Sequence, residues 1–319
     1  MADQSKYIWF NGEIIPWENA KIHVMSHVLH YGSGVFEGIK CYSSEDGPVI
    51  FRLNEHIDRL FSSAEKYGIN IPYSKEIIIK SCIDTVHLNG FNDCYIRPIA
   101  FYGYDTLGVH PKECPVEVAV ASFYWGAYLG EEGLISGVNI TISPWKKISL
   151  DAFPSSAKAS GQYMNSMLAV QDARKKGYDE ALLLNQHGHI AEGSGQNIFI
   201  VKNGKVFTND ENASILMGIT RDSVIKLCKD LNKEIEITNI TEEMLMNADE
   251  AFFTGSATEI TPIATIDKTP IGDGKPGVLT LKLKDVYLKI VHGKDPQYRN
   301  WLTFVNANIR SSETVLENH

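Results

Sequence analysis

The stretch SSAKASGQYMNS, residues Ser155–Ser166, decides how the rest of this chain is interpreted. It places Lys158 among small residues, directly before a helical pattern that begins near Gln162. Small neighbours allow a backbone to approach a flat ligand closely. An amine in such a crowded, partly dry pocket loses its charge more easily and becomes nucleophilic, so Lys158 could react with an aldehyde cofactor. The alternative is a solvated loop lysine, and the other motifs have to decide between the two.

Length and composition predict a globular protein of two domains. The chain has 319 residues, of which 44% are hydrophobic and 22% charged. A net charge of -9 without a basic stripe argues against nucleic acid as a partner. The five cysteines are scattered without metal-site or CxxC spacing, which favours reduced thiols in a cytoplasmic protein. Neither a signal peptide nor an apolar run of membrane-spanning length is visible, so we expect no membrane association.

Turn and cap residues predict the elements of the first half. Asn11-Gly12 is typical of a type I′ hairpin turn. Asn54 and Ser74 are predicted to cap two helices, and Pro98 predicts an edge or bulge position for its strand. The predicted elements are strands over 7–10, 13–16, 94–102 and 116–124, a strand-like region over 35–51 broken at 43–48, and helices over 54–68 and 75–89.

In the second half, four glycines loosen residues 125–137, and we place the domain boundary there. Asn203-Gly204 predicts another hairpin, and Thr220 is predicted to cap the helix that follows Gly218. The other predicted helices cover 162–176 and 277–291, and the strands cover 180–184, 197–201, 206–208, 234–238, 251–254 and 260–266. Long strands with segregated helices predict an α+β fold whose second domain is barrel-like.

Three loops of the second half could bind a planar, phosphorylated ligand. Glu192, in AEGSGQNIF, could pair with a pyridine nitrogen and keep that ring protonated, which makes the ring an electron sink. The run GITR at Gly218–Arg221 begins a helix, whose N–H groups and dipole attract phosphate. The run GSATEITP at Gly255–Pro262 offers N–H and hydroxyl donors to anions. The alternatives are an exposed turn glutamate, an ordinary capped helix and a β-turn.

Two arginines of the first half could bind anions. Arg59, in NEHIDRL, is predicted beside the apolar stripe of its helix, where a bidentate guanidinium suits a phosphate. The alternative is a surface ion pair with Glu55 or Asp58. Tyr95 and Arg97, in YIRP, share one strand face, which indicates carboxylate binding unless that face is the solvated one.

Together, and in this order, these motifs match a known family. The chain resembles the branched-chain amino-acid aminotransferases among the fold-type IV pyridoxal-phosphate enzymes. The matching runs are HYGSGVFEGIKCY at 30–42, HIDRL at 56–60, YIRP at 95–98, GAYLG at 126–130, SAKASGQYMNS at 156–166, EGSGQNIF at 192–199, GITRDSV at 218–224, GSATEITP at 255–262 and WLTFVN at 301–306. The resemblance implies a two-domain α+β fold, with a smaller N-terminal α/β domain over 1–124, an interdomain loop over 125–137 and a larger C-terminal pseudobarrel domain over 138–319.

The resemblance also implies a role for each motif. Lys158 would be the catalytic residue and would bind pyridoxal 5′-phosphate covalently, while Tyr163 would meet its phenolic oxygen and Glu192 its ring nitrogen. The cofactor phosphate would be held by Arg59, Gly218, Ile219, Thr220 and Ser256. The substrate α-carboxylate would be held by Ser256, Ala257 and Tyr95, and the substrate side chain would be surrounded by Phe36, Trp125 and Tyr128. Arg97 would bind the distal carboxylate of glutamate. Three further residues would lie near this pocket or reach across a dimer interface: Tyr31, Leu107 and Val109.

The implied activity is transamination between the branched-chain L-amino acids leucine, isoleucine and valine and 2-oxoglutarate. The implied partners are amino acids and 2-oxo acids, and the implied assembly is a homodimer or a larger homo-oligomer such as a hexamer. Other enzymes of this fold remain alternatives: a D-amino-acid transaminase, an R-selective amine transaminase or an aminodeoxychorismate lyase. A cofactor-binding protein without turnover is a further alternative. The sequence leaves open the preferred amino acid and whether the pathway role is synthesis or degradation.

One residue departs from the family pattern in a way that matters. In the family that the chain resembles, the loop that contains Glu192 usually reads EGxGEN, but position 196 is glutamine here. Gln196 removes one negative charge and leaves Glu192 as the only carboxylate of this loop. The usual charge balance of the loop is therefore not expected to hold.

Overall fold

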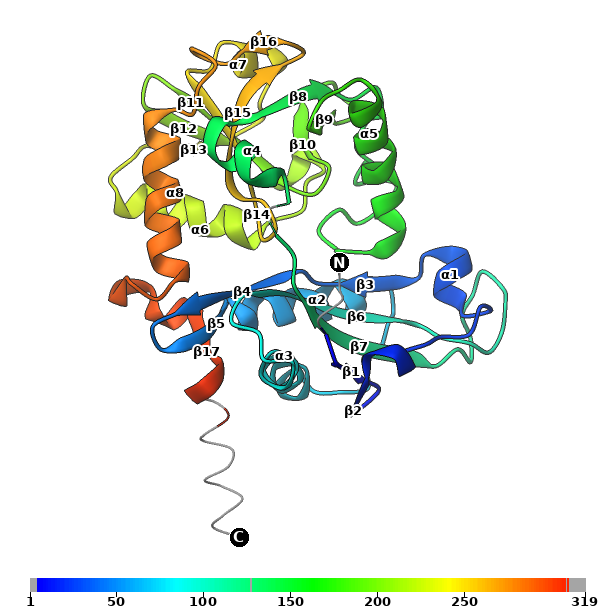
Figure 1. Ribbon diagram of the computed structural model, residues 1–319. Helices are drawn as coiled ribbons and strands as arrows, with labels where there is room; N and C mark the ends of the chain where they lie inside the picture. Colours follow the sequence, from blue (N-terminus) through cyan, green and yellow to red (C-terminus); the bar gives the residue numbers. More distant parts are fainter. Residues whose placement is uncertain (1–4, 127, 308, 310–319) are drawn as a thin grey trace. The chain divides into compact units, whose positions relative to one another are not determined.

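The computed structural model describes residues 5–126, 128–307 and 309 (Figure 1). The chain divides into two compact units. The first unit consists of residues 1–125, 157–161 and 289–319, and the second of residues 126–156 and 162–288. The short segment that carries Lys158 thus belongs to the first unit, although the chain on both sides of it belongs to the second.

The first unit is built on an antiparallel sheet with two long helices, α2 and α3. Its described strands follow the order β17-β5-β4-β6-β7-β1-β2, with β3 also paired to β6. The strands are β1 Tyr7–Phe10, β2 Glu13–Pro16, β3 Gly34–Phe36, β4 Ile39–Ser44, β5 Gly47–Phe51, β6 Cys94–Tyr102, β7 Val116–Phe123 and β17 Leu302–Phe304. The helices are α1 His27–Tyr31, α2 Leu53–Lys66 and α3 Lys75–Asn89, with 3-10 turns at Trp17–Asn19 and Pro296–Trp301.

Alternation along β6 separates a core face from a second face that carries Tyr95 and Arg97. Ile96 and Ala100 are fully buried in a core that also contains Ile57 of α2 and Ile78 of α3. Burial of such apolar side chains provides most of the favourable free energy of folding. Arg97 lies one residue along the strand from Ile96 and therefore points to the other face of the sheet, away from this core.

The expectation that Pro98 marks an edge or a bulge is wrong, because β6 lies inside the sheet between β7 and the pair β3 and β4. On one side, β6 pairs with β4 up to Ile96 and with β3 from Ile99. Pro98 lies in the gap between these two ladders, where its missing N–H costs no strand hydrogen bond. Its carbonyl accepts a hydrogen bond from the backbone N–H of Glu37 at 2.8 Å.

The cap predictions are partly confirmed. Ser74 caps α3 by accepting from the N–H of Ile77, and Gly90 ends that helix in the left-handed conformation. Asn54 does not cap α2, which begins at Leu53 after Arg52. The backbone N–H of Arg52 donates to the carbonyl of Trp301 at 2.7 Å, so a tertiary contact and not a local cap fixes this helix start.

The second unit contains a larger, curled sheet with helices α5, α6 and α8. Its described strands follow the order β10-β9-β8-β15-β14-β11-β12-β13, with β16 paired to β15. They are β8 Val138–Ile142, β9 Glu180–Leu184, β10 Ile190–Gly193, β11 Asn197–Lys202, β12 Lys205–Thr208, β13 Ile235–Ile237, β14 Glu250–Gly255, β15 Glu259–Ile266 and β16 Thr269–Pro270. The helices are α4 Gly130–Ser136, α5 Tyr163–Lys175, α6 Ile219–Asp230, α7 Glu242–Met246 and α8 Val278–Val291, with a 3-10 turn at Glu211–Ala213. The end of α8 from Lys289 and the start of a further 3-10 turn, Ser160–Gln162, belong to the first unit. The expected α+β class is confirmed, whereas β8, β10, β16, α4 and α7 were not predicted.

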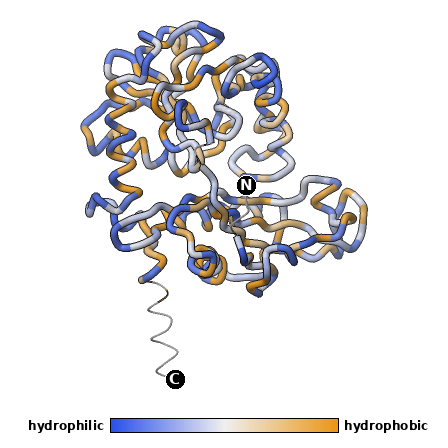
Figure 2. Tube along the Cα trace, in the orientation of Figure 1, coloured by the Kyte–Doolittle hydropathy of each residue, from blue (hydrophilic) through white to orange (hydrophobic). Residues whose placement is uncertain are grey.

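Helix α8 shows how the apolar pattern places an element. Hydrophobic and hydrophilic residues alternate along it in Figure 2. Leu283, Tyr287 and Ile290 recur at helical spacing and are fully buried, as predicted from their period. No helix within the described residues is long and apolar enough to span a membrane.

Candidate active site

The backbone around Lys158 is fixed by the first unit on both sides. The carbonyl of Lys158 accepts from the N–H of Phe36 in β3, and its N–H donates to the hydroxyl of Ser63 in α2, both at 3.0 Å. Ala159 forms an isolated bridge with Val35. The small residues serve this packing, because a side chain at Gly32 would lie 2.7 Å from the backbone of Gly161.

The amine of Lys158 is partly buried and lies beside aromatic and cationic groups. Its Nζ is 5.0 Å from the centre of the Phe36 ring. Burial lowers the pKa of Lys158 to about 8, and the nearby guanidinium groups of Arg59 and Arg97 contribute to this shift, against the opposing effect of Glu37 and Tyr95. At pH 7 about a tenth of this amine is therefore uncharged, far more than for an ordinary lysine, and the uncharged form is the one that acts as nucleophile or base.

A buried carboxylate, Glu37, holds two side chains of α2. Its side chain is fully buried, and it accepts from Arg59 Nε at 2.6 Å, from a second Arg59 nitrogen at 2.9 Å and from His56 Nδ1 at 2.7 Å. Burial alone would raise the pKa of Glu37, but Arg59 and His56 hold it well below the usual range. Burial lowers the pKa of His56, so its imidazole is neutral near pH 7 and donates from Nδ1. Arg59 is thus fixed by this bidentate pair, and the alternative of a surface pair with Glu55 or Asp58 is wrong, since those carboxylates pair with Arg52 and Lys75.

The second face of β6 carries Tyr95 and Arg97, as their alternation predicts. The Arg97 guanidinium lies 4.8 Å from the Phe36 ring centre and 5.3 Å from that of Tyr95. Its Nε is buried and has no hydrogen-bond partner among the described residues. The Tyr95 ring meets Trp125 edge-on at 4.6 Å, and its hydroxyl lies so close to Gly38 that a side chain there would clash at 1.9 Å. An arginine with an unsatisfied nitrogen between two aromatic rings can bind an anion.

In the second unit, Glu192 is held by three donors. Oε1 accepts from Lys147 Nζ at 2.6 Å, and Oε2 accepts from Asn197 Nδ2 at 3.0 Å and from the N–H of Leu216 at 3.1 Å. Burial opposes the charge of Lys147, but the adjacent Glu192 raises the pKa of Lys147 above its ordinary value. The alternative of an exposed turn glutamate is wrong, because Glu192 is 5% exposed.

The start of α6 lies beside this carboxylate. Asn197 also donates to the carbonyl of Leu216 at 2.8 Å, and its Oδ1 approaches Gly218 so closely that a side chain there would clash at 2.1 Å. Thr220 does not cap α6, because Gly218 is the N-cap and Thr220 lies inside the first turn. The buried Thr220 hydroxyl has no hydrogen-bond partner among the described residues. A helix start with an unsatisfied hydroxyl fits a phosphate group, so these residues fit the phosphate of pyridoxal phosphate.

The other predicted residues take the following places. Ser256 and Ala257 lie in the tight turn between β14 and β15, whose Gly255 is adjacent to Gln196. Tyr163 begins α5, and burial and Glu180 raise the pKa of Tyr128. Tyr31, Leu107 and Val109 are exposed in the first unit at 44%, 45% and 83% and stay predictions. Sequence reasoning missed Glu37, His56, Lys147, Glu180 and Asn197. All but Asn197 act through contacts between segments far apart in the chain, whereas Asn197 lies in the same motif as its partner Glu192.

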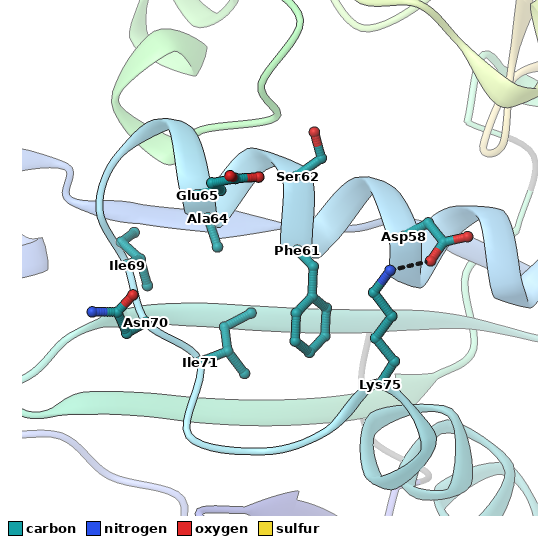
Figure 3. A pocket seen from close by; sticks show the side chains of 9 residues that line it. All are labelled: Asp58, Phe61, Ser62, Ala64, Glu65, Ile69, Asn70, Ile71 and Lys75. Carbon is teal, nitrogen blue, oxygen red and sulfur yellow. Dashed lines mark hydrogen bonds and ion pairs between the residues drawn. The ribbon is translucent and has the colours of Figure 1, made fainter.

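A separate hollow of about 480 Å³ lies along α2 of the first unit (Figure 3). Phe61, Ile69 and Ile71 form its apolar part, and an ion pair of 2.5 Å between Lys75 and Asp58 crosses its rim. None of the described residues that line it belongs to the groups around Lys158 or Glu192. Within the described part of the chain, no cluster of side chains could hold a metal ion.

Comparison with known proteins agrees with this chemistry. The family model described as amino-transferase class IV matches residues 34–266. A branched-chain-amino-acid aminotransferase of Escherichia coli strain K12 is 42% identical over 304 residues, which cover 95% of this chain and 98% of that relative. The branched-chain amino acid aminotransferase of T.th., solved with pyridoxamine 5′-phosphate, has a TM-score of 0.91 and 45% identity and covers 94% of this chain and 99% of its own. The same protein solved with N-(5′-phosphopyridoxyl)-L-glutamate has a TM-score of 0.89 and 43% identity over 94% and 99% of the two chains.

The chain therefore belongs to the class IV aminotransferases. Within that family, these relatives, which it matches over nearly their whole length, are branched-chain amino-acid aminotransferases.

Proposed function

We propose that this chain transfers the amino group between branched-chain L-amino acids and 2-oxoglutarate, with pyridoxal 5′-phosphate as cofactor and Lys158 as its covalent attachment point. The observation that carries the proposal is Lys158 itself, a lysine with a lowered pKa whose backbone is bonded to Phe36 and Ser63. The relatives solved with cofactor derivatives support the choice of cofactor.

The residues of each unit fit separate parts of the reaction. When bound, pyridoxal phosphate supplies an aldehyde for the amine and a protonated ring that takes up electrons from the substrate. The neutral amine of Lys158 removes the proton from the substrate α-carbon and later returns one. Glu192 keeps a negative charge at the ring nitrogen, and the start of α6 with Thr220 binds the phosphate.

Transamination assays of the purified protein test this function. With 2-oxoglutarate as acceptor, L-leucine, L-isoleucine and L-valine should yield L-glutamate, while D-alanine and R-amines should not. Lys158→Ala should lose nearly all turnover, because both nucleophile and base are removed. A D-amino-acid product, pyruvate from aminodeoxychorismate, or near-normal leucine turnover by Lys158→Ala would each contradict the proposal.

The proposal assigns Arg97 to the distal carboxylate of glutamate and 2-oxoglutarate. Its guanidinium has an unsatisfied buried nitrogen between Phe36 and Tyr95, whereas leucine offers no charge to bind there. Arg97→Met keeps length and apolar bulk and should reduce kcat/KM for 2-oxoglutarate by about 2–4 kcal/mol. The leucine half-reaction, measured separately in single turnovers, should change far less. Equal losses in both half-reactions would mean that Arg97 supports the fold or the α-carboxylate site.

We further propose a dimer formed through an exposed apolar surface of the first unit. Val24, Leu29, Tyr31, Leu107 and Val109 are all exposed there. Hydrogen bonds from His27 to Gly103 and Gly108 join the two segments that carry them. A patch of this kind indicates a protein interface. Sedimentation should show a dimer or a larger oligomer, and Val109→Asp should weaken it, whereas a monomeric parent protein would contradict the proposal.

We also propose that the protein is located in the cytoplasm, and the state of its thiols supports this. All five cysteines are free and buried in the structure, as expected for a reducing compartment. Recovery of the chain in a secreted fraction would contradict this proposal.

A further inference from the structure

Gln196 lies buried in the turn between β10 and β11, and its side chain bonds within the second unit. Its amide nitrogen donates to Glu180 Oε2 at 2.7 Å, and its Oε1 accepts from the N–H of Gly195. Both side chains are buried, with 3% of Gln196 and 1% of Glu180 exposed. Because a carboxylate only accepts hydrogen bonds, the amide nitrogen has to face Glu180. The other oxygen of Glu180 accepts from the N–H of Ala181 at 2.7 Å.

This pair lies at the turn that carries Glu192. The N–H of Gly193 donates to the carbonyl of Gln196 at 2.8 Å, and Asn197 Nδ2 donates to Glu192 at 3.0 Å. The Gln196 side chain fills the space above Gly193, where an added side chain would lie 3.1 Å from it. The backbone of the turn is thus closed on itself, and the bond to Glu180 ties it to β9.

We propose that Gln196 and Glu180 are positioning residues for Glu192, and that the amide at position 196 keeps this placement unchanged as the pH rises into the alkaline range. The inference rests on the proposed function, which gives Glu192 its contact with the cofactor ring. A glutamate at position 196 could make the same bond only by sharing one proton with Glu180, since two buried carboxylates at this distance repel each other. Gln196 makes the bond with no proton to lose.

The surroundings of the pair offer little compensation for a second negative charge. Burial raises the pKa of Glu180, while hydrogen bonds from Ala181, Gln196 and Ser194 oppose that shift. Arg174 of α5 is the cation that acts on Glu180 and on Tyr128. Burial and Glu180 raise the pKa of Tyr128, with a smaller contribution from Tyr163. A phenol is either neutral or negatively charged, so neither tyrosine supplies positive charge. A carboxyl at position 196 could therefore keep the bond to Glu180 only by sharing a proton with it.

The first experiment measures the melting temperature of the cofactor-free protein between pH 6 and pH 9.5. In Gln196→Glu, the new carboxyl should have a folded-state pKa above its unfolded value. Its stabilising bond is then present at low pH and is lost as the pH rises through the folded-state pKa. We expect the melting temperature of this variant to fall by about 3 °C more than that of the parent across this range. Gln186→Glu is the matched control, because Gln186 is exposed in the turn after β9 and undergoes the same charge change.

The second experiment measures kcat/KM for leucine over the same pH range with saturating cofactor. The deficit of Gln196→Glu relative to the parent should grow with pH and reach about tenfold at the alkaline end, the equivalent of about 1.4 kcal/mol. The exchanged pair Glu180→Gln/Gln196→Glu restores one amide facing one carboxylate and should recover both the melting curve and the activity. Glu180→Gln alone leaves two amides and should not show the alkaline loss.

These outcomes separate the inference from the proposed function. A melting curve of Gln196→Glu that follows Gln186→Glu, or an exchanged pair no better than Gln196→Glu, would overturn the pair itself without using activity. The melting temperature of Gln196→Glu could depend on pH while its kcat/KM stays in a constant ratio to that of the parent. That result would overturn the link from the pair to Glu192. Glu192→Gln tests the function independently, because unchanged single-turnover rates in that variant would refute the ring contact and leave the melting data valid.

Discussion

The buried carboxylate of Glu37 is the constraint on which the chemistry of the first unit depends. The guanidinium groups of Arg59 and Arg97 both act on the amine of Lys158 there, and Glu37 is a buried anion that opposes them. Its bidentate bond to Arg59 fixes a guanidinium that would otherwise move, and its bond to His56 keeps that ring in place. The positive charges of the two arginines help to lower the pKa of Lys158, whose amine, unlike a guanidinium group, can lose its proton near neutral pH.

The second unit surrounds a buried carboxylate with hydrogen-bond donors. Glu192 accepts from Lys147, from Asn197 and from the N–H of Leu216, and the same Asn197 packs against Gly218 at the start of α6. The proposed partner of the ring nitrogen and the proposed phosphate-binding helix start are therefore positioned by one shared residue, Asn197. Any shift of the turn that carries Glu192 would therefore be passed through Asn197 to the start of this helix.

The sequence predicted more of the fold than of the site. Local signals such as Asn11-Gly12, Ser74 and the apolar period of α8 act within a few residues and predicted their elements correctly. The predictions from Pro98 and Asn54 were wrong. Pro98 is accommodated inside the sheet because it lies in a gap between two ladders, and the start of α2 is fixed by a contact with Trp301 and not by a cap at Asn54. The motif residues identified the chemistry, but the partners that tune it come from distant segments. Glu37 lies 22 residues from Arg59, and Lys147 lies 45 residues from Glu192, so no local pattern connects them.

The central claim is that the fold itself makes Lys158 a base near neutral pH, before any cofactor binds. Competitive acetylation of the cofactor-free protein over a pH series, with the peptide of Lys158 followed by mass spectrometry, measures this directly. The reactive form is the neutral amine, so the rate should rise with pH and level off above a midpoint, set by the pKa of Lys158, of about 8. A midpoint near the ordinary lysine pKa of 10.5 would show that the burial and the neighbouring guanidinium groups do not tune this amine, and would contradict the account.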